Sequence, residues 1–469
     1  MIVAPASAPV FRSPRAAHGL LVPGSGATVS REGALAALLR GELGNANVRG
    51  GLSAGKELIR LASGPGRITF YVSLPAPGKH ANDRRYPLAV VGPGWLGLLE
   101  SPTTRLDGLV SIADVAPSVR SLARGERPRI HATQHDAPLE PLAELNRRLE
   151  DAHAARRPAD VVLACLVLAL AAFAIATRAG RLARAALLAA PATVLTSILL
   201  SGAGASTPWL AVPLLAVVSA ATALAGGLVR PALVPLAAVL LAIFALLWTR
   251  PEWNALGLIG PHPAAGGRFY GLTNQVETLM LAPALALGAL AGARALPGVA
   301  LLVAAAVGAG RLGADGGGLI VYLVGFLALA VRLYRVPALR AAAATGIAAA
   351  GALALVAVDA VTGGSSHVSD ALGGGPGGLF HDFMRRLELS AEAVVASPQA
   401  AIFTVIGLAA LVWFALRRPR LELLDAYLVA VAVSLAVNDT PNDIAGYGSL
   451  CALALWAYLR TEKTPAPLQ

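Results

Sequence analysis

Long apolar runs fill the chain from about residue 156 onward, and a short polar stretch separates each run from the next. A helix needs about 20 apolar residues to cross the hydrocarbon core of a bilayer. The pattern therefore predicts about eleven transmembrane helices. Their expected positions are residues 159–177, 185–202, 208–229, 231–249, 272–293, 297–310, 317–331, 341–361, 400–416, 422–437 and 444–459.

The first 155 residues have a different pattern, with short β-branched stretches, many prolines and glycines, and no run long enough to span a bilayer. Residues 20–22, 68–72 and 88–91 predict strands, and residues 32–40 and 139–153 predict helices. The expected fold class is therefore an α-helical polytopic membrane protein with a small N-terminal α/β extracytoplasmic domain. The expected domains are residues 1–155 and residues 156–469, and the second contains a long outer loop at residues 362–399.

The composition agrees with a membrane protein, because 56% of the residues are hydrophobic and only 14% are charged. The formal net charge of +11 would also fit a nucleic-acid-binding protein, but most basic residues are single arginines at the ends of apolar runs. That placement is typical of membrane topology. We expect the lipid bilayer as a partner and no nucleic acid. Cys165 and Cys451 both lie in apolar runs, which favours neither a disulfide nor a metal site.

Arginines follow every second apolar run, and basic connections stay on the cytoplasmic side of a membrane. The abundance of alanine, leucine, glycine and arginine over lysine is typical of a bacterial genome rich in GC. We therefore expect a multi-pass protein of the bacterial cytoplasmic (inner) membrane, with the N-terminal domain outside and the C-terminus in the cytoplasm. Residues 1–18 contain no adequate signal region, so either the first span carries the domain across or a signal segment precedes this start.

The stretch from Gly267 to Glu277 places polar side chains at the start of an apolar run. Asn274 and Glu277 are three residues apart, so they share one face of a helix. A carboxylate about one turn inside the hydrocarbon is costly and indicates a functional site by default. A buried structural pair between Glu277 and Arg268 is the alternative.

Further polar residues collect in the connections that the arginine pattern places outside. The predicted catalytic residues are Glu277, Asp315 and His367. The predicted substrate-binding residues are Arg268, Tyr270, Asn274, Asp359, Arg385, Arg386, Asn438 and Asp439. Several of these positions also have a structural explanation, since aspartate and asparagine commonly cap helices and arginines can rest on lipid headgroups. The histidines lack the spacing of metal ligands, and we expect neither a metal nor another cofactor.

Part of the N-terminal region resembles a known superfamily. Residues 87–94, 101–105 and 108–118, which include Gly108-Leu109-Val110 and Asp114-Val115-Ala116-Pro117, resemble the late segment of alkaline-phosphatase-superfamily domains. Only His80 and Asp83 lie near the expected ligand positions, and no nucleophile or full ligand set accompanies them. The resemblance therefore implies a degenerate domain used for docking or scaffolding. Within it, Asp114 is expected in the N-cap region of a helix.

The whole chain also looks like a family of bacterial multi-spanning proteins that carry a phosphatase-like extracytoplasmic domain. The resemblance rests on Arg-Phe-Tyr-Gly-x-x-Asn-x-x-Glu at residues 268–277, Ala-Asp-Gly-Gly-Gly at residues 314–318, Ser-His-Val at residues 366–368 and Asn-Asp-Thr at residues 438–440. This family is uncharacterised, with no established activity, and so implies an architecture and no reaction.

Two functions remain open on this basis, together with a third, non-catalytic one. In architecture the chain is similar to O-antigen ligases and polyprenyl-phosphate-dependent glycosyltransferases, an analogy that implies a transferase or ligase for an anionic lipid-linked substrate. Arg268 with Arg385 or Arg386 would hold the pyrophosphate, and Glu277 or Asp315 would be the general base, with His367 as the alternative base. A transporter or flippase is the second candidate, with Glu277 and Asp359 as proton-coupling groups. An envelope assembly partner is the third, and its protein partners are not indicated.

Overall fold

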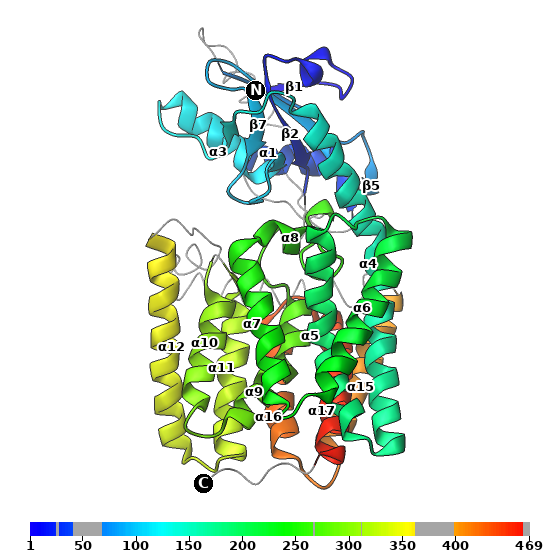
Figure 1. Cartoon of the computed structure of the whole chain (residues 1–469). Coiled ribbons are helices and arrows are strands. Elements are labelled where there is room, and N and C mark those ends of the chain that lie inside the picture. The colour runs from blue at the N-terminus through cyan, green and yellow to red at the C-terminus, as the bar shows by residue number, and fades with distance from the viewer. Residues whose placement is uncertain (25–27, 41–67, 266–267, 311, 362–397, 463–469) are drawn as a thin grey trace. The chain divides into compact units, whose positions relative to one another are not determined.

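The computed structural model describes residues 1–24, 28–40, 68–265, 268–310, 312–361 and 398–462. The chain divides into two compact units, which we describe separately (Figure 1). The α/β unit comprises Met1–Ala155, Ser206–Pro208 and Pro261–Tyr270, and the helical unit comprises Arg156–Ala205, Trp209–Gly260 and Gly271–Gln469. The described residues are mostly helical, with a small N-terminal α/β region.

A mixed sheet of seven strands forms the centre of the α/β unit, with the strand order β1-β4-β6-β2-β7-β9 and with β8 also paired to β2. The strands β2, β6 and β4 pair in antiparallel fashion, whereas β7 and β8 run parallel to β2. A separate antiparallel pair is formed by β3 and β5. The strands are β1 (Ile2–Val3), β2 (Ala17–Val22), β3 (Thr28–Ser30), β4 (Thr69–Val72), β5 (Lys79–Ala81), β6 (Tyr86–Val91), β7 (Gly97–Glu100), β8 (Leu109–Ser111) and β9 (His131–Thr133).

Alternating side chains of these strands build the core of the α/β unit. Phe70 and Val72 of β4 are buried, whereas Thr69 and Tyr71 between them are partly exposed, as expected for a strand with one face on the core. The ring of Phe70 meets that of Trp95 edge to face, with centroids 5.5 Å apart. The helices α1 (Arg31–Arg40) and α3 (Ile112–Ala123) pack against each other and contribute Leu38 and Val115 to the same core.

The helical unit is built from long, largely antiparallel helices, and short connections join most of those from α4 to α12 and those from α15 to α17 (Figure 1). Near its centre, α17 packs against α5, α9, α15 and α16, and α11 packs against α9, α10, α12 and α16. The helices are α4 (Leu139–Thr177), α5 (Gly180–Gly202), α6 (Pro208–Leu228), α7 (Leu233–Thr249), α8 (Pro251–Ala255), α9 (Asn274–Ala291), α10 (Leu296–Gly308), α11 (Gly316–Arg332), α12 (Ala338–Val361), α15 (Pro398–Leu416), α16 (Glu422–Val437) and α17 (Pro441–Thr461).

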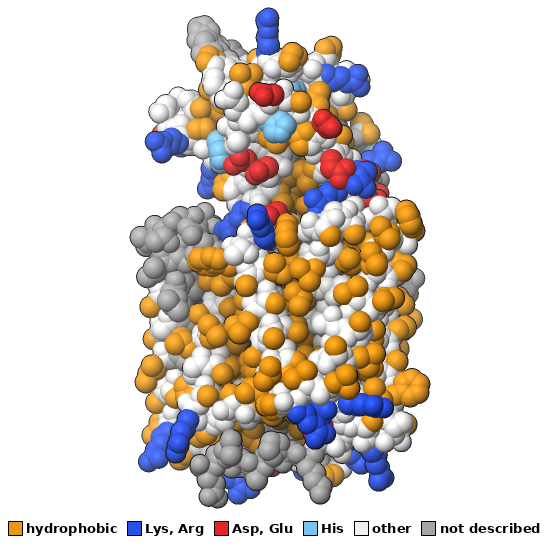
Figure 2. Space-filling model, viewed as in Figure 1, with side chains coloured by type: hydrophobic (Ala, Val, Ile, Leu, Met, Phe, Trp, Pro, Cys, Tyr) orange, Lys and Arg blue, Asp and Glu red, His pale blue; other side chains and the backbone are white. Residues whose placement is uncertain are grey.

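The outer helices expose apolar side chains along their sides. Phe173 of α4, Val217 of α6 and Phe403 of α15 are each more than 60% exposed. Figure 2 shows apolar side chains over much of the visible side of the helical unit. Among the described residues, α4, α5 and α6 are long and apolar enough to cross a membrane, judged by length and composition. Shorter apolar helices include Leu233–Thr249, Leu296–Gly308, Gly316–Arg332 and Ala400–Leu416.

Arginine side chains gather at one end of the helical unit (Figure 2). Several of them are paired with carboxylates there. Glu462 binds Arg184, whose Nε also donates to the carbonyl of Gly227 at 2.9 Å. Asp425 binds both Arg332 and Arg420. The pairs Arg184–Glu462 and Arg332–Asp425 join helix ends that are far apart in the sequence.

Each of the apolar runs identified in the sequence coincides with a helix, and the predicted strands at residues 20–22, 68–72 and 88–91 lie in β2, β4 and β6. One boundary was wrong. We expected a helix to stop at residue 153 and a new one to begin at 159, but α4 continues through both positions with Pro158 inside it. A proline weakens a helix without always ending it, because neighbouring groups can satisfy the carbonyl that the proline leaves without a donor. The predicted outer loop at residues 362–399 falls almost entirely outside the described residues.

Candidate functional site

Four helix ends meet at the end of the helical unit opposite the arginine cluster, and their polar caps build the site. Thr273 caps α9, since its hydroxyl accepts a hydrogen bond from the amide of Val276 at 3.3 Å. Asp315 caps α11 by accepting from the amide of Gly318 at 3.1 Å. Residues 438–440 connect the end of α16 to the start of α17, and Pro441 opens α17. Cap residues of this kind are favoured because the first amides of a helix have no partner within it.

Glu277 lies one turn inside α9 and is completely buried, with 0% of its surface exposed. The Asn438 side-chain amide donates to its Oε2 at 3.2 Å and to the Ser434 hydroxyl at 3.0 Å. The Tyr322 hydroxyl donates to the main-chain carbonyl of Glu277 at 2.9 Å. The Glu277 carboxylate thus accepts from Asn438 at the end of α16, while its main-chain carbonyl accepts from Tyr322 of α11.

Two glycines make this close packing possible. A Cβ atom at Gly318 would lie 3.0 Å from both Cδ and Oε2 of Glu277, and one at Gly317 would lie 2.2 Å from Oδ1 of Asn438. The absence of side chains in the first turn of α11 lets Glu277 and Asn438 approach the helix directly. The positive end of a helix dipole favours a nearby carboxylate, which suits both Glu277 and Asp315.

Asn274, the first residue of α9, connects the site to the start of α17. Its side-chain amide donates to Oδ1 of Asp439 and to the hydroxyl of Thr440, at 2.9 Å in each case. Both acceptors are half-buried, in contrast to Glu277. Asn274 and Glu277 therefore face the same connection between α16 and α17, as their spacing on one helix face predicts.

A further group of polar side chains joins α4 to the site, and our sequence analysis missed most of it. Gln275 donates through Nε2 to Oδ1 of Asp160 and to the hydroxyl of Tyr447, both at 2.8 Å. Asp160 and Tyr447 are also hydrogen-bonded to each other. Arg156, one turn before Asp160, donates to the carbonyl of Gly260 at 2.8 Å. An aspartate inside an apolar run was the available signal for Asp160, by the same reasoning that singled out Glu277.

We call the half-buried part of this site the helix-end cluster. It consists of Arg156, Asp160, Asn274, Gln275, Asp439, Thr440, Asp443 and Tyr447. The three aspartates lie close enough to interact electrostatically, and Arg156 interacts with Asp160 and Asp443. Three carboxylates thus accompany one guanidinium. This balance suits the acceptance of protons or cations better than the binding of an anion.

The structure brings together five of the predicted site residues, namely Glu277, Asp315, Asn438, Asn274 and Asp439. Arg268 and Tyr270 belong to the α/β unit, where the guanidinium of Arg105 lies 3.7 Å from the centre of the Tyr270 ring. His367, Arg385 and Arg386 lie outside the described residues, as does the side chain of Asp359 in α12. Their roles stay predictions.

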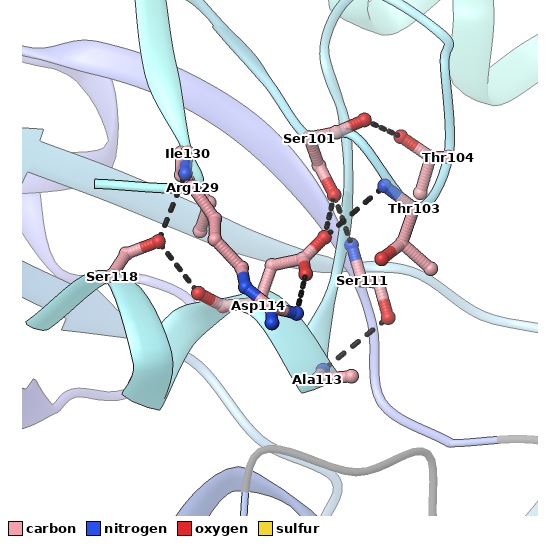
Figure 3. A network of polar contacts seen from close by, with 9 residues as sticks. All are labelled: Ser101, Thr103, Thr104, Ser111, Ala113, Asp114, Ser118, Arg129 and Ile130. Atoms are coloured by element: carbon pink, nitrogen blue, oxygen red, sulfur yellow. Dashed lines mark hydrogen bonds and ion pairs between the residues drawn. The ribbon is translucent and has the colours of Figure 1, made fainter. Parts of the chain in front are cut away.

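The segment that resembles alkaline phosphatases contains a buried polar network instead of an open site (Figure 3). Ser101 donates to the carboxylate of Asp114, the amide of Thr103 donates to the same oxygen at 3.3 Å, and Arg129 lies 3.7 Å from the other oxygen. Asp114 therefore fastens the loop after β7 to α3. Asp114 lies in the first turn of α3, in the N-terminal region of the helix where we expected it, and the N-cap itself is Ser111, whose hydroxyl accepts from the amide of Ala113 at 3.3 Å.

Among the described residues, no group of three or more histidine, cysteine, aspartate or glutamate side chains could hold a metal ion. No model of a known protein family matches the chain, and neither a curated protein nor a solved structure matches it. The resemblances stated for the sequence stay expectations, and the site must be interpreted from its own chemistry.

Proposed function

We propose that this chain is a multi-pass protein of the bacterial cytoplasmic membrane, and that its helix-end cluster is the proton-accepting part of a transferase site for a lipid-linked substrate. The observation that carries the proposal is the group of half-buried aspartates Asp160, Asp439 and Asp443 at one end of an apolar helical unit. A catalytic base must reach the proton that it removes within about 3 Å, or through one water. Half-buried carboxylates at helix ends meet that requirement for an acceptor that approaches from the aqueous side.

Membrane insertion is supported by the apolar sides of α4, α6 and α15, since exposed apolar surface of that extent needs a partner. The arginines at the opposite end of the helical unit support the orientation expected from the sequence, with that end in the cytoplasm. The helix-end cluster would then face the outer side, where lipid-linked envelope precursors are used.

In the proposed reaction one set of residues accepts a proton and a second set neutralises the leaving group. An aspartate of the helix-end cluster would take the proton of an acceptor hydroxyl as its oxygen attacks the carbon that carries the lipid pyrophosphate. The lipid pyrophosphate then leaves with the electrons of the broken bond. Because the cluster is rich in carboxylates, the leaving group would be neutralised by arginines outside it, for which Arg268, Arg385 and Arg386 remain the candidates from the sequence.

A transporter or flippase is the second candidate, and the burial of Glu277 favours it. A carboxylate that is fully buried among Asn438, Gly318 and the start of α11 cannot contact an acceptor without rearrangement. Such a group is suited to taking up a proton when the surrounding helix ends move apart. Glu277 would then couple proton entry to a conformational change.

A deletion strain distinguishes the two candidates. The lipid-linked envelope precursors of the strain are measured, and an impermeant label determines the leaflet in which any precursor accumulates. Accumulation in the outer leaflet is the expected result for a missing transferase. Accumulation in the inner leaflet would assign a flippase instead, and no accumulated precursor would exclude both and favour an assembly partner.

Complementation by variants then tests the residues. We expect Asp443→Asn to fold normally and to restore less than about one hundredth of wild-type activity, the usual scale for loss of a catalytic proton acceptor. Glu277→Gln tests the transporter candidate, in which loss of the buried proton-coupling carboxylate should abolish activity. Glu422→Gln is the matched control, because Glu422 is an exposed carboxylate in the first turn of α16, far from the cluster along that helix. Wild-type activity in both Asp443→Asn and Glu277→Gln would remove the assignment of this site.

A further inference from the structure

The end of the helical unit that is rich in arginine contains two kinds of arginine. Arg184, Arg332 and Arg420 are neutralised by Glu462 or Asp425. Arg417 and Arg460, by contrast, contact aromatic rings and have no carboxylate partner among the residues that the structure describes. An arginine that contacts only aromatic rings still has N–H groups that can donate hydrogen bonds to an oxyanion.

The two arginines belong to the same short pattern on neighbouring helices. Trp413 and Arg417 are four residues apart at the end of α15, and Trp456 and Arg460 are four residues apart at the end of α17. Residues at this spacing lie on one face of a helix. Since α15 and α17 pack against each other, both pairs come together.

Contacts with two indole rings hold the guanidinium of Arg417 in place. Its Cζ atom lies 4.4 Å from the ring centre of Trp413 on its own helix and 4.4 Å from that of Trp456 on α17. The Cζ atom of Arg460 lies 5.3 Å from the centre of the same Trp456 ring. Two guanidinium groups thus contact the same indole ring. Their positive charges repel each other unless an anion is bound between or beside them.

The surrounding surface combines this charge with exposed apolar area. Trp413 is 48% exposed, and Val412 beside it and Leu416 one turn further are 55% and 71% exposed. Arg460 is exposed and Arg417 is half-buried. A ligand that fits must therefore present a phosphate oxyanion to the two guanidiniums and hydrocarbon to the indole and its neighbours.

We propose that Trp413, Arg417, Trp456 and Arg460 form a binding site for the headgroup of an anionic phospholipid. The phosphodiester accepts hydrogen bonds from both arginines, and the exposed ring of Trp413 contacts the first carbons of an acyl chain. Tryptophan and arginine favour this level of a bilayer, where one end of the ligand is polar and the other apolar. The site rests on the proposed membrane insertion but is independent of the reaction proposed for the opposite end.

Titration of the detergent-purified protein with phosphatidylglycerol, followed by native mass spectrometry, tests the site. Each arginine near an anionic lipid contributes about 1 kcal/mol, which is about a fivefold change in affinity. We therefore expect Arg417→Gln/Arg460→Gln to weaken phosphatidylglycerol binding about thirtyfold, and Arg460→Gln alone, at an exposed position, about fivefold. Phosphatidylcholine should bind wild type and variants alike.

Arg294→Gln is the matched control, because Arg294 is an exposed arginine in the connection between α9 and α10. Equal weakening by this control would show attraction by general positive charge and would overturn the site. Displacement of the lipid by millimolar inorganic phosphate would overturn the assignment to a lipid and indicate a soluble phosphate instead. Extraction of the protein from cells without detergent would refute membrane insertion, whereas the titration reports on the arginines in either case.

Discussion

Replacement of Gly318 by alanine tests whether the first turn of α11 packs directly against the buried carboxylate of Glu277. The added Cβ would lie 2.8 Å from Cγ1 of Val307 and 3.0 Å from Oε2 of Glu277. Carbon atoms in ordinary contact stay about 3.5–4.0 Å apart. Neither neighbour can move into free space, since Val307 and Glu277 are both fully buried.

The expected change in the free energy of unfolding of Gly318→Ala follows from two opposing effects. An extra methyl group in a well-packed interior costs about 1–3 kcal/mol. Alanine also favours the helical conformation over glycine by up to about 1 kcal/mol, with less effect in a first turn. We expect the free energy of unfolding of Gly318→Ala to fall by about 1–2 kcal/mol, together with loss of the Asn438 contact to Glu277.

Thermal unfolding in one fixed detergent, followed by tryptophan fluorescence, measures the effect. Gly298→Ala is the control, because a Cβ at Gly298 in α10 would meet no atom within 4 Å and only helix propensity acts there. Its unfolding midpoint should stay level or rise, while that of Gly318→Ala should fall by a few degrees. Equal midpoints for Gly318→Ala and wild type would refute the direct packing of α11 on the carboxylate.

Two further predictions concern a buried hydroxyl and a buried imidazole. Ser197 accepts hydrogen bonds from the amides of Leu258 and Ile259 at 2.8 and 3.0 Å, so Ser197→Ala should lower the unfolding free energy by about 2–6 kcal/mol, at about 1–3 kcal/mol for each amide left without an acceptor. Thr193→Val, which loses only a bond to a carbonyl of its own helix, should cost less in the same melt. Burial lowers the pKa of His18, although its hydrogen bond to the Ser13 carbonyl opposes this shift. The unfolded chain therefore binds the proton more readily, and stability should fall as the pH drops below about 6.5, by at most about 1.4 kcal/mol per pH unit. His18→Gln should remove this part of the pH dependence in unfolding measured from pH 7.5 to 5, and an unchanged slope would contradict the assignment.

The sequence predicted the helices well because length and apolar character are local properties of a run. It predicted the α/β unit less completely, since strands such as Ile2–Val3 and His131–Thr133 are too short to have a recognisable period. The break expected before Pro158 was wrong because proline indicates a boundary only on average.

Some residues of the candidate site could likewise be predicted from the sequence, and others could not. Glu277 could be identified from the sequence, because an ionisable group inside an apolar run is unusual whatever surrounds it. Its partner Asn438 is 161 residues away, and Gln275 meets Asp160 and Tyr447 across 115 and 172 residues. No local pattern encodes such pairings, so the fully buried Glu277 could not be distinguished from the half-buried aspartates by sequence alone.

The pairing of Arg184 with Glu462 has a consequence for synthesis. The two residues are 278 positions apart, so the carboxylate that neutralises this buried arginine leaves the ribosome long after α5. At roughly 5–20 residues per second the delay is about 14–56 s. During that interval α5 carries an uncompensated charge at a position that the finished protein excludes from water. Until then Arg184 needs water or another polar partner, and its pairing with Glu462 is completed only once α17 has been made.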